Sequence, residues 1–543
     1  MKQIIYLTKI LFFTTAGILL LFSCNTGSRK SKKPVRQQDI TAFYKKHGLT
    51  VPADILTPGQ VKTSIGILRY NDGRPTAATV KKAYHYIDVS RATEAFLNNA
   101  PAIATEVLQK AFAGMGATEA NDVLISEQLI DAHQVWPTGN TGTVYVFGFF
   151  DLKKTGPLVI EMPGKAGPGF VDDGWMRWVT DLGPTGPDRG KGGTYVVLPP
   201  DYKGNIKAPL GGAKAQMKIA GTLRNVFVVK SPTYHNWMAL RGFLVNGKPD
   251  FSVNLFKKKL KIYPLKEATH PPKMKFVNMS GKNTVAVFPA GFRYFKMLND
   301  VIQREPLAAL DAESRGVLSA IGIEKGNPFH PDNYWKNVYD DAAKIGDAVG
   351  RSILFSPRDP EAYLYKNRHW YTGFVGNNYQ WLKDNGRGGM NLDARILFFW
   401  GAIAVTPAMA IKMVGLGSQY AFCSKDKNGN YFDGSKTYKL TIPPHVPAKD
   451  FWSVVLYDPQ TRGMLLTGQK YPAVNNKRSH LKVNPDGSTD LYFGPKAPKG
   501  HESNWLQTVP GKGWFVLFRL YGPLEPWFNK TWKLNDFEML QHP

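Results

Sequence analysis

Four aspartates stand close together in the middle of the first half of the chain, and carboxyl groups at such spacing can do acid–base chemistry. They are Asp172, Asp173, Asp181 and Asp188. Glycoside hydrolysis requires two carboxyl groups that face one cleft, about 5 to 10 Å apart. Successive side chains of a strand point to opposite faces, so Asp172 and Asp173 are not expected to form such a pair with each other. The cluster indicates catalysis with more distant partners, ligand binding, or salt bridges and turn capping.

Basic and aromatic side chains follow these aspartates and can add a binding rim. Aromatic faces stack on sugar rings, while a guanidinium holds anionic groups. The same residue types also suit a packed strand, and both interpretations stay open. The candidate ligand-binding residues are Asp172, Asp173, Arg177, Asp181, Asp188, Lys191, Tyr234 and Arg241.

Familiar catalytic and metal-binding motifs do not match this sequence. The turn around Lys191 is glycine-rich, but Thr185 stands where a phosphate-binding loop needs its first glycine, and Gly192 replaces the Ser or Thr after the lysine. The loop 426–437 lacks the glycine and the bidentate Glu of a calcium site. No Gly-x-Ser-x-Gly elbow is present, and no histidine pair has zinc-protease spacing. We expect no metal and no cofactor, and the sequence leaves open whether the protein is an enzyme.

The N-terminus has the parts of a secretory signal. Lys2 and Lys9 precede an uncharged run that ends just before Cys24. This arrangement resembles a bacterial lipoprotein signal, in which Cys24 carries the lipid. The segment 25–38 is polar and basic, which favours anionic headgroups next to a lipid anchor. With Cys24 lipidated, Cys423 has no partner for an intramolecular disulfide, and we interpret it as a buried apolar residue.

The net charge of the chain indicates anionic partners. It is +27, with 69 basic against 42 acidic residues, and the excess is not confined to the N-terminal segment. Such a surface attracts anionic glycans or lipids by long-range electrostatics. We do not expect nucleic acid as a partner, because no recognition motif for it is visible.

The periodicity of apolar residues predicts helices and strands in separate blocks. Residues 39–116 carry a helical pattern, and so do parts of 291–417, including a buried helix over 396–411. The remaining blocks contain short strands rich in Val, Phe and Tyr between Gly/Pro turns, which is typical of sandwiches. The predicted strands are Val144–Phe150, Leu158–Met162, Thr194–Leu198, Asn225–Val229, Trp237–Val245, Thr437–Ile442, Phe451–Tyr457, Leu481–Val483, Asp490–Phe493 and Trp514–Leu520.

Long motifs carry a family resemblance. VDDGWMRWVTDLGPTGPDRGKGGTYVVLPPDYKG at 171–204 and FVVKSPTYHNWMALRGFLVNG at 227–247 resemble the bacterial family called domain of unknown function 1254. YFDGSKTYKLTIPPHVPAKDFWSVVLYDPQTRGML at 431–465 and YFGPKAPKGHESNWLQTVPGKGWFVLFRLYGPLEPWF at 492–528 resemble its companion, domain of unknown function 1214. The resemblance covers about residues 75–540. It implies a helical N-terminal part and two β-sandwich modules similar to jelly rolls, and it implies no activity.

These observations predict an α+β protein with helical insertions between two sandwiches. The predicted segments are a lipoprotein signal peptide (1–23), a basic tether (24–38), a helical N-terminal region (39–116), a first β-sandwich module (117–290), a helical connecting region (291–417) and a second β-sandwich module (418–543).

We expect an envelope lipoprotein on the periplasmic or outer-membrane side that has a binding or structural role, with carbohydrate or an anionic glycan as the ligand class. The alternative is a hydrolase that acts on an envelope or imported polymer through the carboxylates near Asp172. The sequence leaves the ligand, the oligomeric state and the membrane leaflet open.

Overall fold

The computed structural model describes residues 36–204, 211–477 and 479–541. The predicted signal peptide, Cys24 and nearly all of the tether 24–38 lie outside these residues. Within the described residues, no helix combines the length and the apolar character needed to cross a membrane. The chain divides into two compact units, one ending at Tyr86 and one beginning at Ile87.

The first unit combines a helix with a small antiparallel sheet. Its elements are α1 (Gln37–Lys46), β1 (Gln60–Thr63), β2 (Gly66–Asn71), β3 (Arg74–Pro75) and the start of α2 (Ala77–Asn98). The sheet differs from the helical pattern predicted for 39–116. The reason is local: Gly66 and Gly73 adopt positive φ angles of 97° and 74°, which reverse the chain twice within a few residues.

The second unit contains a first sandwich made of two sheets. The larger sheet has the order β15-β4-β6-β13-β8-β9, and the smaller has the order β11-β12-β10-β7-β14. The strands of the larger sheet are β4 (Asp122–Ile125), β6 (Val144–Asp151), β8 (Gly169–Asp173), β9 (Trp178–Leu182), β13 (His235–Gly242) and β15 (Lys275–Asn278). Those of the smaller sheet are β7 (Leu158–Met162), β10 (Gly193–Leu198), β11 (Ala213–Ile219), β12 (Thr222–Lys230) and β14 (Lys261–Pro264). The short elements of this module are β5 (Gln134–Val135), α4 (Leu152–Thr155), α5 (Asp250–Lys259) and β16 (Thr284–Val285).

A second sandwich follows near the C-terminus, again with two sheets. Their orders are β17-β23-β19-β20 and β22-β21-β18-β24. The strands are β17 (Ser418–Cys423), β18 (Thr437–Ile442), β19 (Ala448–Tyr457), β20 (Ala473–Asn475), β21 (Thr489–Gly494), β22 (Trp505–Gln507), β23 (Phe515–Pro523) and β24 (Glu538–Leu540), with α11 (Glu525–Phe528) after β23. The predicted strand Leu481–Val483 is wrong. The amide side chain of Asn504 donates to the Lys482 carbonyl and accepts from its N–H, both at 2.8 Å, and so takes the place of a neighbouring strand.

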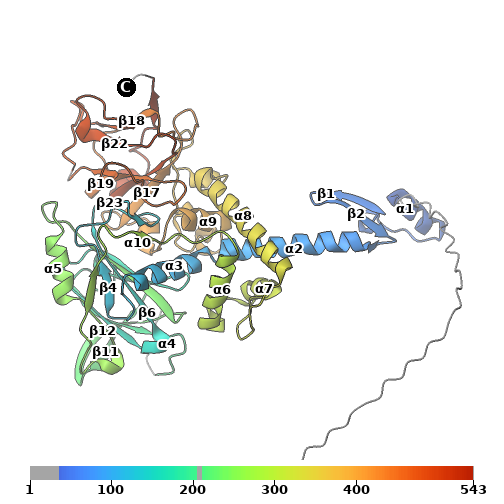
Figure 1. Ribbon diagram of the computed structural model, residues 1–543, viewed down its shortest axis with the longest axis horizontal. Coiled ribbons are helices and arrows are strands. Elements are labelled where there is room, and N and C mark those ends of the chain that lie inside the picture. Colours follow the sequence, from blue (N-terminus) through green and yellow to red (C-terminus); the bar gives the residue numbers. More distant parts are fainter. Residues whose placement is uncertain (1–35, 205–210, 478, 542–543) are drawn as a thin grey trace, which may run out of the picture. The chain divides into compact units, whose positions relative to one another are not determined.

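Helices lie between and beside the sandwiches (Figure 1). They are the end of α2, α3 (Ala100–Gly114), α6 (Phe292–Arg304), α7 (Ala312–Ala320), α8 (Asn333–Phe355), α9 (Leu392–Gly401) and α10 (Pro407–Ala410). The predicted helix over 396–411 is wrong beyond Gly401. Pro407 disfavours helical backbone at the residue before it, and Thr406 is extended with φ −135°. Pro407 instead opens α10 at the first helical position.

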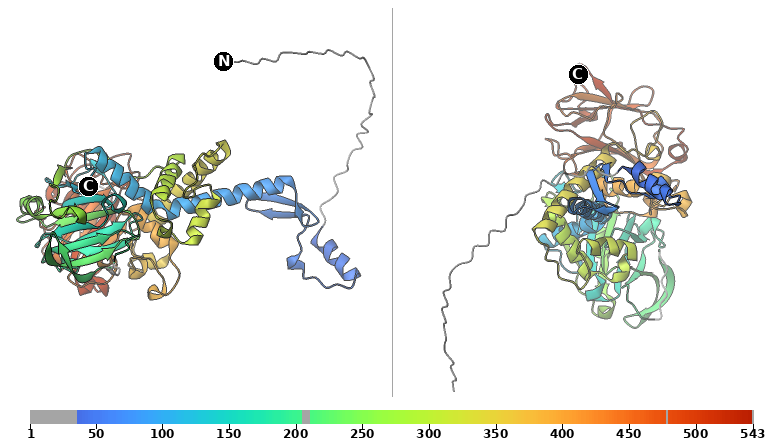
Figure 2. Two further views of the ribbon diagram at one scale, coloured as in Figure 1. Left: turned by 90° about the horizontal axis from the view of Figure 1, so that it is seen from below. Right: turned by 90° about the vertical axis from the view of Figure 1, so that its right-hand side faces the viewer.

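The two sandwiches share a core, because the central strands of each bury both faces. On β13, Met238 and Leu240 point into the first sandwich, while Trp237 and Ala239 join a cluster that also contains Leu517 of β23. Side chains of β23 alternate in the same way between the second sandwich and this shared cluster. Figure 2 shows the second sandwich, in red, against the first, in green and teal. This shared core is where the candidate site lies.

Candidate functional site

A cavity of about 50 Å³ lies in the shared core, and we call it the inter-module cavity. Most of the side chains that line it are aromatic or aliphatic, but two lining residues are arginines, Arg241 and Arg519. Aromatic side chains make up much of the remaining lining. They include Trp136, Tyr145, Phe147, Phe170, Trp237, Tyr420 and Phe422.

Strand alternation places Arg241 at the cavity. It follows Trp237 and Ala239 at two-residue spacing on β13, so all three point to the shared core. Arg241 stands directly opposite Tyr145 on the neighbouring strand β6. Its Nη1 donates to Ser418 Oγ of the second sandwich at 3.4 Å, and the side chain is partly buried.

The second arginine reaches the cavity from the other sandwich. Arg519 on β23 is 2% exposed and stands opposite Tyr420 on β17. Its Nη2 donates to the Thr138 carbonyl at 2.6 Å and to Tyr457 Oη at 2.6 Å. These bonds hold one edge of the guanidinium against the loop before β6. Each sandwich thus supplies one arginine to the cavity.

The positive charge of this pair has no carboxylate partner. Among the ion pairs of the described residues, none within 4.0 Å includes Arg241 or Arg519. A buried unpaired cation is costly, and tyrosines offset part of that cost. Burial raises the pKa of Tyr420, but the charges of Arg241 and Arg519 together with hydrogen bonds from Ser418 and Arg241 outweigh burial, so the net shift of that pKa is downward.

Several donors at the cavity have no acceptor. Arg519 Nε and the indole N–H groups of Trp136 and Trp237 are buried and lack a hydrogen-bond partner among the described residues. Buried polar groups are normally paired, so an unpaired set in one cavity indicates a missing water, ion or ligand. All three groups are donors. The arrangement therefore suits a group that brings acceptors and negative charge.

A smaller cavity of about 20 Å³ adjoins this site and contains one of the predicted aspartates. Asp181 lines it together with Phe170, Arg241, Thr406 and Ser418. Burial raises the pKa of Asp181 to about 7, although Trp178 and Thr406 act in the opposite direction. Arg241 borders both cavities, so it is the predicted site residue that connects Asp181 to the inter-module cavity.

The carboxyl groups of Asp172 and Asp173 bond to neighbouring parts of the fold. Asp172 is fully buried, its Oδ2 accepts from the Val405 N–H at 3.1 Å, and burial raises its pKa well above the usual range. Asp173 accepts from the Arg177 Nε at 2.6 Å and from the Trp175 N–H at 2.8 Å, which closes the turn between β8 and β9. Arg177 also donates to a backbone carbonyl at residue 309, and so links this turn to the helices.

Asp188 and Lys191 belong to a separate turn before β10. The Asp188 carboxylate accepts from Tyr195 Oη at 2.6 Å and from the Gly192 N–H at 3.1 Å. The side chain of Lys191 is exposed. The carboxylate organises the glycine-rich turn, and neither residue lines the inter-module cavity.

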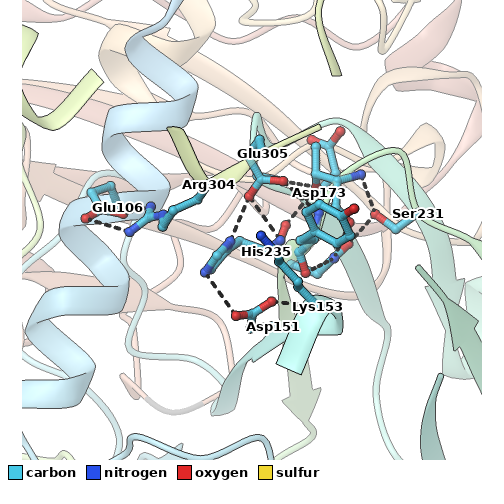
Figure 3. Close-up of polar contacts among 12 residues, drawn as sticks. Glu106, Asp151, Lys153, Asp173, Ser231, His235, Arg304 and Glu305 are labelled. Carbon is cyan, nitrogen blue, oxygen red and sulfur yellow. Dashed lines mark hydrogen bonds and ion pairs between the residues drawn. The ribbon is translucent and has the colours of Figure 1, made fainter. Parts of the chain in front are cut away.

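Tyr234 lies in a polar cluster at the start of β13, and Figure 3 shows Glu305, His235 and Asp151 of this cluster. Glu305 accepts from the Tyr234 N–H at 2.7 Å and contacts His235 Nδ1 at 2.8 Å, while Asp151 Oδ2 is 3.8 Å from His235 Nε2. The Tyr234 hydroxyl donates to Asp201 at 2.9 Å. The carboxylate of Glu305 is 2% exposed and ties the end of α6 to the sheet, which accounts for this cluster as a structural junction.

The structure therefore distributes the predicted residues over several places. Arg241 lines the inter-module cavity, Asp181 lies next to it, and Asp173 pairs with Arg177. Sequence reasoning missed other residues of the cavity, chiefly Trp136, Tyr420 and Arg519. One signal was available, because Arg519 is the single charged residue in the strand FVLFRLYGP, where only a special environment explains it.

The geometry defines a protein of two β-sandwich modules with a cavity between them. Residues 120–264 match the family model "Protein of unknown function (DUF1254)", and residues 417–525 match "Protein of unknown function (DUF1214)". The chain thus contains a DUF1254 domain followed by a DUF1214 domain, which confirms the resemblance in the sequence.

Two solved structures are similar to the chain at low sequence identity. One is the VPA0106 protein from Vibrio parahaemolyticus, with 16% identity, a TM-score of 0.48, and coverage of 84% of this chain and 100% of the other. The second is an uncharacterized protein from Burkholderia cenocepacia, with 11% identity, a TM-score of 0.35, and coverage of 84% and 96%. None of the curated proteins matches this chain.

Proposed function

We propose that this chain is a binding protein that holds a small anion in the inter-module cavity. The observation that carries the proposal is the donor set. Among the residues that the structure describes, Arg519 Nε, Trp136 Nε1 and Trp237 Nε1 have no acceptor, and the two guanidiniums have no carboxylate within 4.0 Å. An unmade hydrogen bond of a buried group costs about 1–3 kcal/mol. A bound anion relieves several such costs together.

The placement of the carboxyl groups favours binding over hydrolysis. Of the four clustered aspartates, Asp181 alone lies beside the inter-module cavity. Asp172 is enclosed, and Asp173 and Asp188 stabilise turns. A hydrolase that uses a carboxyl pair needs two of them to converge on one cleft. The hydrolase stays a separate prediction, which analysis of the recovered ligand tests.

Carbohydrate is proposed for a different place, because the inter-module cavity is small. Its volume of about 50 Å³ is well below the roughly 150 Å³ that accommodates benzene. An open groove of about 440 Å³ beside the β8–β9 turn is large enough for a sugar ring. There Trp178 is part-exposed and lies 5.5 Å from Tyr379 in an edge-to-face pair, and Arg177 is on the rim.

Titration of neutral and anionic oligosaccharides into wild type and Trp178→Ala tests this second site. We expect the variant to lose any saccharide binding and to keep small-anion binding. Equal saccharide binding by both proteins, or none by wild type, contradicts the groove proposal.

We further propose that a lipid on Cys24 anchors the protein in the bacterial cell envelope and that the basic segment 25–38 contacts anionic headgroups. The support is the order of charged start, apolar run and cysteine. Mass spectrometry of the membrane fraction checks this point. The expected result is a lipid-modified Cys24 at the mature N-terminus, and a Cys24→Ser protein that stays in the membrane by the same amount contradicts it.

A thermal-shift screen of the whole protein against small anions tests the main proposal. A ligand that binds only the folded state raises the apparent stability. We expect a rise in Tm for wild type and for the control Arg387→Gln, whose exposed arginine pairs with Asp384, and none for Arg241→Gln. The oligosaccharides of the groove titration decide the alternative, because saccharides recovered intact support binding, whereas fragments support the hydrolase. Equal shifts in Arg241→Gln and wild type contradict the proposal.

A further inference from the structure

We infer that the anion of the inter-module cavity is a short-chain monocarboxylate of about two to four carbons. This inference rests on the proposed function and names its ligand class. Three properties of the cavity carry it: its volume, the division of its walls into polar and apolar parts, and its charge.

The volume limits the ligand to a few non-hydrogen atoms. A cavity needs roughly 10–15 Å³ for each water it holds, so about 50 Å³ corresponds to a handful of water-sized groups. Acetate, propionate and butyrate have about this size. Benzoate and hexanoate do not fit unless the walls move, and close-packed interiors resist such movement.

The walls combine hydrogen-bond donors with apolar side chains. The guanidiniums and indole N–H groups supply donors, and a carboxylate matches the planar fork of a guanidinium. The other walls include Phe147, Phe398 and Leu517, which offer no hydrogen bonds. A tetrahedral oxyanion has oxygens on all sides, and some would be buried against these rings at a high cost. A carboxylate has one polar end and an alkyl tail for the apolar side.

The charge also favours a monoanion. Tyr420 stands beside both arginines, and their positive charge lowers its pKa in spite of burial. The Tyr420 ring also lies 5.2 Å from the Arg519 guanidinium carbon. The electron-rich face of that ring attracts the guanidinium and offsets part of its charge. A dianion pays a larger desolvation penalty than a monoanion for entering the same buried site.

Calorimetric titrations of the full-length protein at fixed ionic strength in sodium chloride test the inference. The probes are acetate, propionate, butyrate, hexanoate and benzoate, with phosphate and sulfate as oxyanions and propionamide as a neutral analogue. We expect affinity to peak between acetate and butyrate, at least tenfold above hexanoate, phosphate and sulfate, with no binding of propionamide.

A pair of leucine variants tests whether the alkyl tail lies in the cavity. Leu517 lines it, whereas Leu520 lies on the opposite face of β23, in the core of the second sandwich. Leu517→Ala enlarges the cavity, and we expect the preferred chain to lengthen by two or three carbons. Leu520→Ala removes the same atoms elsewhere and is expected to keep the wild-type preference. If Leu517→Ala does not fold, the affinities of wild type for carboxylates of increasing chain length still test the inference.

The outcomes separate this inference from the proposed function. Arg241-dependent binding of phosphate or sulfate as tight as propionate overturns the monocarboxylate and leaves anion binding intact. Binding of hexanoate or benzoate as tight as propionate also overturns it. No binding of any anion overturns both. A chain-length optimum that moves equally in Leu520→Ala overturns the placement of the tail.

Discussion

Arg519 and Tyr420 are direct cross-strand partners on β23 and β17, with the guanidinium carbon 5.2 Å from the centre of the phenol ring. This pair places a buried cation at the point where two sandwiches meet, with a tyrosine where a carboxylate would ordinarily compensate it. Arg241 and Tyr145 repeat the relationship across β13 and β6 in the other sandwich. Two arginine–tyrosine pairs, one from each module, thus frame the inter-module cavity.

Methionine substitutions of the two arginines are expected to differ in their effect on stability. The Arg241 guanidinium donates to Ser418 Oγ at 3.4 Å and interacts with Tyr420, and Arg241→Met removes a partly buried cation for which the described residues supply no carboxylate within 4.0 Å. We expect its free energy of unfolding to stay within about 1 kcal/mol of wild type. Arg519→Met leaves the Thr138 carbonyl and Tyr457 Oη without their donor, and about 2–4 kcal/mol is expected to be lost. Urea unfolding without added ligand measures both, and equal losses contradict the prediction.

Removal of an unpaired indole N–H is expected to weaken anion binding and to leave the stability of the fold unchanged. Trp237→Phe deletes a buried donor that has no partner in the described part of the chain, so the free protein loses no hydrogen bond there. We expect at least a fivefold loss of anion affinity by calorimetry. The control is Trp514→Phe, because Trp514 also has an unpaired buried N–H but belongs to the core of the second sandwich. A similar loss of affinity in both variants would show that packing, and not the donor, matters.

Asp181 is expected to make stability depend on pH. Its pKa is raised to about 7 in the folded protein, above the usual value near 3.9 in the unfolded chain. The folded state therefore holds a proton that the unfolded state has released. The stabilisation that protonated Asp181 gives is therefore full below pH 4 and is lost progressively as pH rises to about 7. Above pH 7 the free energy of unfolding no longer changes on account of this group. The change is up to about 4 kcal/mol, at about 1.4 kcal/mol per pH unit.

The comparison of wild type with Asp181→Asn isolates this contribution. Asparagine has no proton to release, so the variant is expected to gain stability relative to wild type as pH rises from 4 to 7. Chemical unfolding at half-unit steps of pH measures the difference. A difference in free energy of unfolding that is constant with pH contradicts the assignment.

The β8–β9 turn is expected to depend on Asp173. Its buried carboxylate accepts from Arg177 Nε at 2.6 Å and from the N–H groups of Trp175 and Arg177 at 2.8 and 2.9 Å. Asp173→Ala leaves these donors unpaired, with an expected loss of about 2–4 kcal/mol. Asp311→Ala is the matched control, because Asp311 caps an exposed helix start and is expected to lose about 1 kcal/mol. Thermal unfolding distinguishes the two, and similar losses would refute the role of Asp173.

The strand pattern made much of the fold predictable. Leu158–Met162 and Thr437–Ile442 are strands with the predicted bounds, because short runs rich in β-branched residues between turn residues favour strands. The strand predicted at Leu481–Val483 failed because a distant side chain, Asn504, bonds to that backbone. Such a tertiary contact leaves no local trace in the sequence.

The cavity was harder to predict than the fold. In β13 and β23 both faces are buried, so alternation shows which residues share a face but not which face meets the other module. Arg241 was a candidate because it follows an aromatic run. Arg519 lies 278 positions further along, and only the packing of the two sandwiches brings it to the same cavity.

A crystal structure of the protein with 3-bromopropionate shows whether the inter-module cavity binds a short carboxylate, because bromine gives an anomalous signal that locates the ligand. We expect a bromine peak in the inter-module cavity, with the carboxylate toward Arg241 and Arg519 and the bromine end toward Leu517. A cavity that holds only water at saturating ligand, with bromine peaks confined to other surfaces, would contradict it.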